Sequence, residues 1–191
     1  MKKIIFCSIC AVGLALLLSG CGATKTDDVT VIKNNSKNMK IISQAFDNEA
    51  SIPAKYTCDG LGINPPFVIS GVPENTVSLA LVAWDPDVPH AIRTDGNWDH
   101  WVVFNINPST QQINEGQEPD GVHGITTSNT HAYVPPCPPD GQHRYFFKVY
   151  ALDTTLDLSE DATRADVEQA LTGHVLDEAQ IMGVYCREGN C

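Results

Sequence analysis

The sequence predicts a mainly β protein, with one β-sandwich domain and a small helical supplement near the C-terminus. Apolar and polar residues alternate in short segments, and proline, glycine and asparagine separate these segments at short intervals. Only one stretch, close to the C-terminus, has the capping residues and the spacing of a helix. We place the domain at residues 39–191, which is long enough for one sizeable core.

Three segments alternate as strands do, at residues 77–85, 100–107 and 144–152. In the first, Leu79, Leu81 and Ala83 share one face with Asp85. The second is expected to place His100, Val102, Phe104 and Ile106 on one face and Trp101 and Val103 on the other. The third divides into Tyr145, Phe147 and Val149 against Arg144, Phe146, Lys148 and Tyr150. Because both faces of the third segment are substantially apolar, it is predicted to be a central strand.

A helix is predicted after Thr163, because Asp166 completes a capping box and Gly173 provides a stop. Residues 180–186 form a further short strand or helix, and periodicity does not choose between the two. Two long loops are expected, at residues 88–99 and 115–142. Loops of this length in a compact domain usually carry function.

The N-terminus has the layout of a secretory signal, which we assign to residues 1–20. Lys2 and Lys3 precede a run without acidic or basic residues that extends to Gly20. Its apolar part, residues 4–18, is shorter than the roughly 20 residues that a membrane-spanning helix needs. A permanent transmembrane helix is therefore the weaker alternative.

The signal ends in Leu18-Ser19-Gly20-Cys21, which resembles the lipobox of bacterial lipoproteins, where the cysteine is lipidated and becomes the mature N-terminus. Acyl chains contribute roughly 0.8 kcal/mol per buried methylene, so two or three chains hold a protein stably on a membrane. Residues 21–38 are polar and are predicted to be a flexible tether after the lipidated cysteine. The sequence thus predicts an exported protein of the bacterial cell envelope, lipid-anchored to the periplasmic or surface face of a membrane.

The chain is strongly acidic, with 12 Lys plus Arg, 23 Asp plus Glu and a formal net charge of −11 at pH 7. This charge opposes binding to nucleic acid and to anionic membrane surfaces. Any site for an anion must therefore be local and enclosed.

Four cysteines remain in the domain once the signal and Cys21 are set aside, namely Cys58, Cys137, Cys186 and Cys191. An even number of cysteines in an exported protein predicts disulfides. Of the three possible pairings we expect Cys58 with Cys137 and Cys186 with Cys191, the latter because its short spacer closes easily. Free thiols buried as small apolar residues are the alternative.

Polar residues cluster where the predicted strands meet the long loops. The clusters are Asp85-Pro86-Asp87-Val88-Pro89, Trp98-Asp99-His100-Trp101 and Pro138-Pro139-Asp140-Gly141-Gln142-His143-Arg144-Tyr145. They resemble the Asp-Pro-Asp-x-Pro, His-Trp-Val and Gly-x-His-Arg-Tyr motifs of the phosphatidylethanolamine-binding family, whose bacterial branch is called Raf kinase inhibitor-like. Further matches to the bacterial and archaeal members occur at residues 56–60, 64–66, 136–139 and 162–176. Together the matches span nearly all of residues 39–185.

The resemblance implies a Greek-key β-sandwich with a small helical supplement. It also implies a ligand pocket formed by Asp85, His100, Pro138, Pro139, His143 and Tyr145. His and Tyr donors can surround a phosphate or a carboxylate, and Asp85 can orient an imidazole and raise its pKa. Asp87 is expected to brace its loop, Arg144 to pair with a carboxylate, and Trp98 to line the pocket mouth. Pro135 departs from the family pattern, because it replaces a glycine and removes an N–H beside the pocket.

We expect a non-catalytic binding protein without a cofactor, whose pocket takes a small anion or a phospholipid headgroup. Affinity for an anion is expected to be highest in mild acid, where His100 and His143 carry charge. The resemblance also implies a role as an inhibitor or modulator of another protein. Two alternatives stay open: a hydrolase that uses Cys137 or an Asp/His site, and a divalent-metal site at Asp85, His100 and His143.

Overall fold

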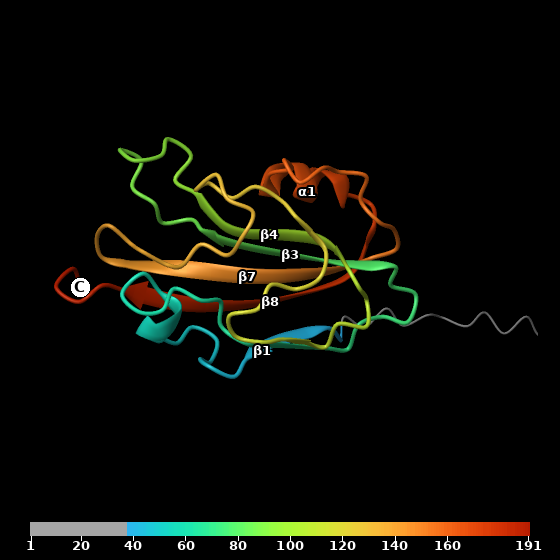
Figure 1. Cartoon of the computed structure of the whole chain (residues 1–191), viewed down its shortest axis with the longest axis horizontal. Helices are drawn as coiled ribbons and strands as arrows, with labels where there is room; N and C mark the ends of the chain where they lie inside the picture. The colour runs from blue at the N-terminus through green and yellow to red at the C-terminus, as the bar shows by residue number, and fades with distance from the viewer. Residues whose placement is uncertain (1–37) are drawn as a thin grey trace, which may run out of the picture. The chain divides into compact units, whose positions relative to one another are not determined.

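The computed structural model describes residues 38–191, which form two antiparallel β-sheets and one α-helix (Figure 1). The expected signal (residues 1–20), Cys21 and the tether up to residue 37 lie outside the described residues. In chain order the elements are β1 (Lys40–Ser43), the 3₁₀ helix η1 (Ala54–Tyr56), β2 (Phe67–Ser70), β3 (Ser78–Asp85), β4 (Trp98–Ile106), β5 (Gln112–Ile113), β6 (Val122–His123), β7 (Gln142–Leu152), α1 (Arg164–Ala170) and β8 (Val175–Cys186). Within residues 38–191, no helix has the length and apolar character needed to cross a bilayer.

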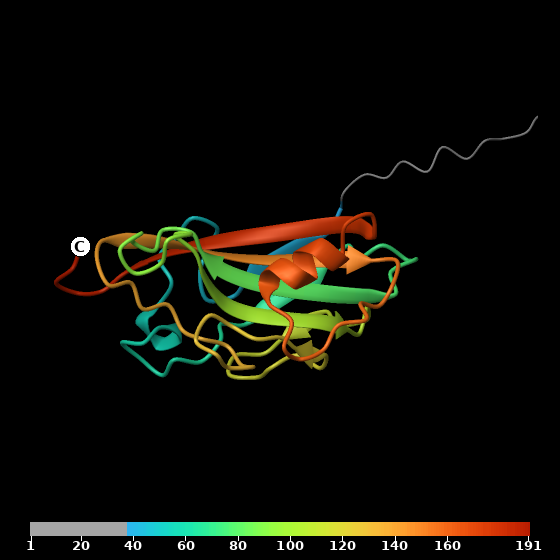
Figure 2. The same ribbon diagram turned by 90° about the horizontal axis from the view of Figure 1, so that it is seen from above.

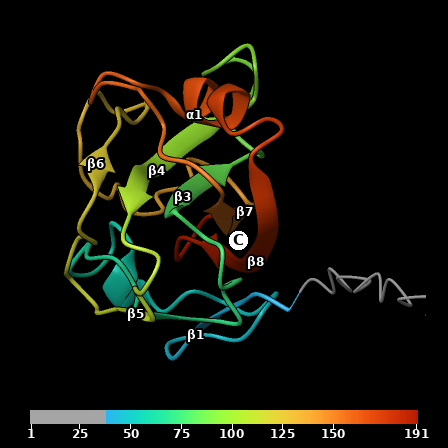
Figure 3. The same ribbon diagram turned by 90° about the vertical axis from the view of Figure 1, so that its right-hand side faces the viewer.

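The domain has three layers, which the view in Figure 3 separates. A large sheet with the order β6-β4-β3-β7-β8 is the middle layer, and a small sheet with the order β1-β2-β5 covers one of its faces. Figure 2 shows α1 lying across the opposite face. The main core lies between the sheets and contains Phe67, Trp101 and Phe147, while a smaller core under α1 contains Phe104 and Val167. The predicted mainly β sandwich with a small helix near the C-terminus is confirmed.

The alternation of β3 and β7 is confirmed. Leu79, Leu81 and Ala83 face the core between the sheets, and Asp85 follows them on the same face, where it contacts β7. β7 lies between β3 and β8, so it is the central strand that its two apolar faces predicted. Its Tyr145 contributes to the main core, whereas Tyr150 belongs to the core under α1.

The predicted faces of β4 are wrong for His100 and Ile106. Both lie on the side of the sandwich core, with Trp101 and Val103, and not with Val102 and Phe104. The cause is two register shifts against β3, because each inserts one extra residue in β4 and reverses the alternation. Asn105, at one of them, has the positive φ of 56° that a bulge can require. The other shift turns His100 toward Tyr145 on β7.

The helix begins where the sequence predicts it. Thr163 is the N-cap of α1 and forms the complete capping box with Asp166, and the chain turns at Gly173 with a φ of 86°. Residues 180–186 belong to the 12-residue strand β8, a choice that periodicity left open. The remaining four strands were not predicted, because segments of two to four residues are too short to show a period of two.

Candidate functional site

A pocket of about 290 Å³ lies at the end of the large sheet where β3 ends and β4 begins. Its wall is mostly apolar and consists of Val88, Ile92, Trp98, Val134, Pro135 and Pro139, with Asp85, His100, Ser128 and Cys137 completing it. The two long loops supply most of these residues, and no Lys or Arg of residues 38–191 lines the pocket. A concave, mostly apolar site with a few polar groups is typical of small-ligand binding.

Asp85 and His143 form a buried pair at the inner end of this pocket. Oδ2 of Asp85 accepts a hydrogen bond from Nδ1 of His143 at 2.7 Å, and Oδ1 accepts one from the backbone N–H of Asp87 at 2.8 Å. Both side chains are 4% exposed, so a charge on either one depends on the other. Burial opposes the charged form of His143, but the hydrogen bond and charge of Asp85, with those of Asp140, outweigh it and raise the pKa of His143. The positive charge of His143 is thus compensated within the pair.

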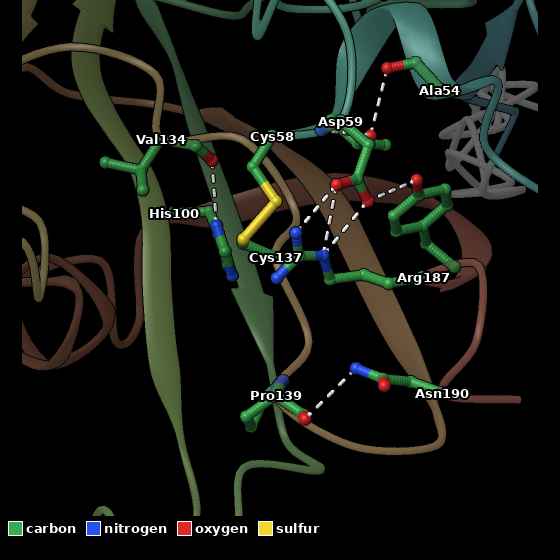
Figure 4. Close-up of a disulfide and its surroundings, with 11 residues drawn as sticks. Ala54, Cys58, Asp59, His100, Val134, Cys137, Pro139, Arg187 and Asn190 are labelled. Carbon is green, nitrogen blue, oxygen red and sulfur yellow. Dashed lines mark hydrogen bonds and ion pairs between the residues drawn. A yellow bond between two sulfur atoms is a disulfide. The ribbon is translucent and has the colours of Figure 1, made fainter.

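The pKa of His100 is shifted in the opposite direction to that of His143. Nδ1 of His100 donates to the carbonyl oxygen of Val134 at 2.8 Å (Figure 4), and the N–H of Val134 donates back to the carbonyl of His100 at 2.8 Å. Because a carbonyl only accepts, this contact places the ring hydrogen on Nδ1. Burial lowers the pKa of His100, although the Val134 carbonyl and the charge of Asp85 oppose the shift. The ring is therefore neutral at neutral pH.

Two buried polar atoms beside the pocket have no hydrogen-bond partner among residues 38–191, Nε2 of His100 and the hydroxyl of Tyr145. The two rings meet edge to face with 5.3 Å between their centroids. Burial, followed by the charge of Asp85, raises the pKa of Tyr145 above its ordinary value, so its hydroxyl stays protonated. A buried polar atom without a partner costs free energy, and such atoms mark a place for a ligand or a water.

The six predicted pocket residues have three different placements in the structure. Asp85, His100 and Pro139 line the cavity. His143 and Tyr145 lie behind them on β7, where each contacts one of the lining side chains. Pro138 is buried in the loop and does not line the cavity. Trp98 lines the cavity as expected. The sequence analysis did not predict four further lining residues, which are Val88, Ile92, Ser128 and Val134. Their place in or beside the long loops was the only indication that the sequence offered.

Asp87 braces the loop after β3, as expected. Its Oδ2 accepts hydrogen bonds from the backbone N–H and from Nε of Arg144, each at 2.9 Å, and Oδ1 accepts one from Nη2 at 2.7 Å. The hydrogen bonds from Arg144 hold the pKa of Asp87 below its usual range. This contact ties the end of β3 to the start of β7, next to the buried pair.

The disulfide between Cys58 and Cys137 holds the outer wall of the pocket (Figure 4). Cys137 lines the cavity, and the N–H of Cys58 donates to the carbonyl of Pro136 at 3.0 Å. Together with the paired backbone of His100 and Val134, these contacts fix the loop on both sides. The predicted pairing of Cys137 with Cys58 is thus confirmed.

The second expected disulfide, Cys186 with Cys191, closes a small ring at the C-terminus. The ring carries Arg187, which forms a salt bridge with Asp59 at 2.8 Å, and Asn190, whose side-chain N–H donates to the carbonyl of Pro139 at 3.3 Å (Figure 4). The C-terminal ring therefore supports the same loop that forms the pocket.

Neither alternative chemistry fits this geometry. Cys137 is bonded to Cys58 and offers no thiolate, and Nε2 of His143 lies 3.3 Å from Oδ1 of Asp140, where a hydrolase would hold its nucleophile. A metal site at Asp85, His100 and His143 is not favoured either. Asp85 is engaged by His143, and residues 38–191 contain no group of three His, Cys, Asp or Glu side chains arranged to hold a metal.

The comparisons with known proteins agree with this fold. A family model described as phosphatidylethanolamine-binding protein matches residues 42–186. A UPF0098 protein of Chlamydia muridarum is 46% identical over 147 residues, which are 77% of this chain and 98% of the relative. A UPF0098 protein of Methanothermobacter thermautotrophicus is 47% identical over 155 residues, 78% of this chain and 99% of the relative.

Two crystal structures share the architecture. One is described as a putative phosphatidylethanolamine-binding protein homologue from Chlamydia trachomatis, with a TM-score of 0.77 at 43% identity over 80% of this chain and 100% of that one. The other is Escherichia coli YbcL, described as a new member of the mammalian PEBP family, with a TM-score of 0.71 at 27% identity and the same coverage. The chain belongs to the phosphatidylethanolamine-binding protein family.

Proposed function

We propose that this chain is a non-catalytic binding protein whose pocket takes a small oxyanion, either free or as the headgroup of a phospholipid. One observation carries the proposal: Nε2 of His100 is buried without a partner in the described residues, in the wall of a mostly apolar pocket. A bound ligand that pairs with this atom recovers the free energy that its burial costs. The name of the matching family, phosphatidylethanolamine-binding protein, supports a phosphate-bearing ligand.

We also propose that the protein is exported and held on a membrane by lipid at Cys21, as the N-terminal sequence predicts. The two disulfides in the domain support an oxidising compartment, since such bonds rarely persist in a reducing cytosol. The acidity of the chain opposes direct attraction to an anionic bilayer, so the lipid would supply the membrane contact.

We further propose that the protein acts as an inhibitor or modulator of another protein. The pocket has a volume of only about 290 Å³, so a partner would place a single acidic or phosphorylated side chain in it. A partner that binds in this way would lose its affinity when the pocket is occupied by phosphoethanolamine.

Calorimetric titration with phosphoethanolamine tests the binding proposal. His100→Ala removes the unpartnered nitrogen and is expected to weaken binding at least about tenfold, because a hydrogen bond to a charged group contributes about 1.5–3 kcal/mol. His174→Ala is the matched control, since His174 is exposed and precedes β8 at the opposite end of the sheet. Equal affinity of His100→Ala and wild type, or no binding by wild type, would contradict the proposal.

A further inference from the structure

The pocket contains no group that supplies net positive charge. Within residues 38–191 no Lys or Arg lines it, the charge of His143 is compensated by Asp85, and the whole chain carries a formal charge of −11. An anion that enters such a site loses part of its hydration without meeting an unpaired cation. Binding of a bare anion in this state of the protein is therefore unfavourable.

The unpartnered nitrogen that an anion in this pocket would contact is Nε2 of His100. The 2.8 Å contact between Nδ1 and the carbonyl of Val134 keeps the hydrogen on Nδ1, so Nε2 has a lone pair and accepts hydrogen bonds. An ionised oxygen also only accepts. Two acceptors in contact repel each other unless a hydrogen lies between them.

The surroundings of His100 permit a positive charge on this ring once a ligand is present. The titratable and charged groups that face it are Asp85 on β3, Asp99 on β4, and His143 and Tyr145 on β7. The two carboxylates favour a charged ring and His143 opposes it. The backbone contact with Val134 is kept in both states of the ring, because Nδ1 is a donor in each. Addition of a proton at Nε2 therefore requires no rearrangement of the loop.

We propose that an oxyacid binds in this pocket together with one proton, which is held between Nε2 of His100 and an oxygen of the ligand; this inference rests on the proposed function. The proton arrives in either of two ways. A monoprotonated phosphate or phosphate monoester brings it as a P–OH group that donates to Nε2. A ligand without such a group, such as a sulfonate, draws one proton from the solvent onto His100.

The ligand class follows from this requirement. Phosphate monoesters and free phosphate in their singly charged form satisfy the site directly, whereas a doubly charged phosphate must gain a proton first. A phosphodiester headgroup has no P–OH group, so it binds only with proton uptake by the protein. The number of protons taken up on binding thus distinguishes the two ligands: a singly charged free phosphate brings its own proton, whereas a phosphodiester headgroup requires the protein to take one up.

Ethanesulfonate is the decisive probe, because it carries one charge and no proton over the whole working range of pH. Calorimetry of the full chain at about pH 7.5, in two buffers with different ionisation enthalpies, measures the protons taken up per ligand. We expect about one proton, and an affinity that falls about tenfold for each unit of pH above neutrality. Binding without proton uptake overturns this inference and leaves the proposed function intact, whereas no binding of any oxyanion at any pH overturns both.

Two variants assign the proton to its residue. Gln at position 100 offers a side-chain N–H that does not titrate, so His100→Gln is expected to abolish the uptake and to bind the sulfonate with an affinity independent of pH. His174→Gln is the control and is expected to keep the uptake of wild type. Uptake that survives in His100→Gln, with the thermal unfolding midpoint unchanged, would place the proton on another group and overturn the assignment.

Discussion

Nδ1 of His143 lies 2.7 Å from Oδ2 of Asp85, although 58 positions separate the two residues in the chain. The pair joins the last residue of β3 to the start of β7 in a buried environment. Because each member compensates the charge of the other, removal of either one leaves an unpaired charge buried at the end of the sandwich that carries the pocket.

Asp85→Asn is expected to remove a stabilisation that depends on pH. The folded protein raises the pKa of His143, so the contribution is fully present below the unfolded value of about 6.5 and is lost as pH rises through the folded value. Near pH 6 the substitution should lower the free energy of unfolding by about 3 kcal/mol, the loss typical of a broken buried pair. Urea denaturation of both proteins across the pH range measures the difference, and a difference that is constant with pH would refute the assignment.

His174→Gln serves as the control for this experiment. Nδ1 of His174 donates a hydrogen bond to Oδ1 of Asp153 at 2.8 Å, but both side chains are about half exposed. Exposed pairs contribute little because solvent screens them. The stability of this variant should therefore follow that of wild type at every pH.

The two disulfides should differ in their contributions to stability. Cys58 and Cys137 are separated by 79 positions, and closing that loop is expected to stabilise the fold by about 4.5 kcal/mol in the chain-entropy model. Cys186 and Cys191 are separated by 5 positions, for which the same model gives about 2 kcal/mol. Paired Ser substitutions compared by urea denaturation measure both values. Four free thiols in denatured, unreduced protein would show that neither bond forms.

Asn105 is expected to be sensitive to substitution for two separable reasons. Its side chain donates to the carbonyl of Leu156 at 2.9 Å and accepts from the N–H of Leu156 at 2.8 Å, and its φ is positive. Asn105→Gly keeps the backbone conformation but loses both hydrogen bonds, at about 1 kcal/mol each. Asn105→Ala adds about 1 kcal/mol of backbone strain. Equal stability of Asn105→Gly and Asn105→Ala would contradict the backbone strain that we assign to the positive φ at this register shift in β4.

Cys21→Ser tests the anchor. The lipobox pattern predicts that the variant remains an unlipidated precursor, because the serine cannot carry the thioether-linked lipid. Mass spectrometry and detergent partition of wild type and variant measure this. A variant with the mass and the membrane partition of wild type would rule the anchor out.

The sequence by itself determined the fold class, the faces of β3 and β7, the capped helix and the motif residues Asp85, His100 and His143. These features are local: a period of two, a capping box and short motifs at strand ends are all visible within a few residues. The family resemblance added the expectation that the motifs meet in one pocket. Asp85, His100 and Pro139 do line one.

Only the tertiary structure decided the register shifts in β4 and therefore the face on which His100 lies, because a bulge depends on the pairing with β3. It also decided that Val134, 34 positions from His100, holds the hydrogen on Nδ1, and that Asp85 compensates His143. These contacts join distant parts of the chain, and the protonation of a buried ring depends on the atoms around it rather than on its neighbours in sequence. The residue types in the pocket were therefore predictable, whereas the charge that each of them presents to a ligand was not.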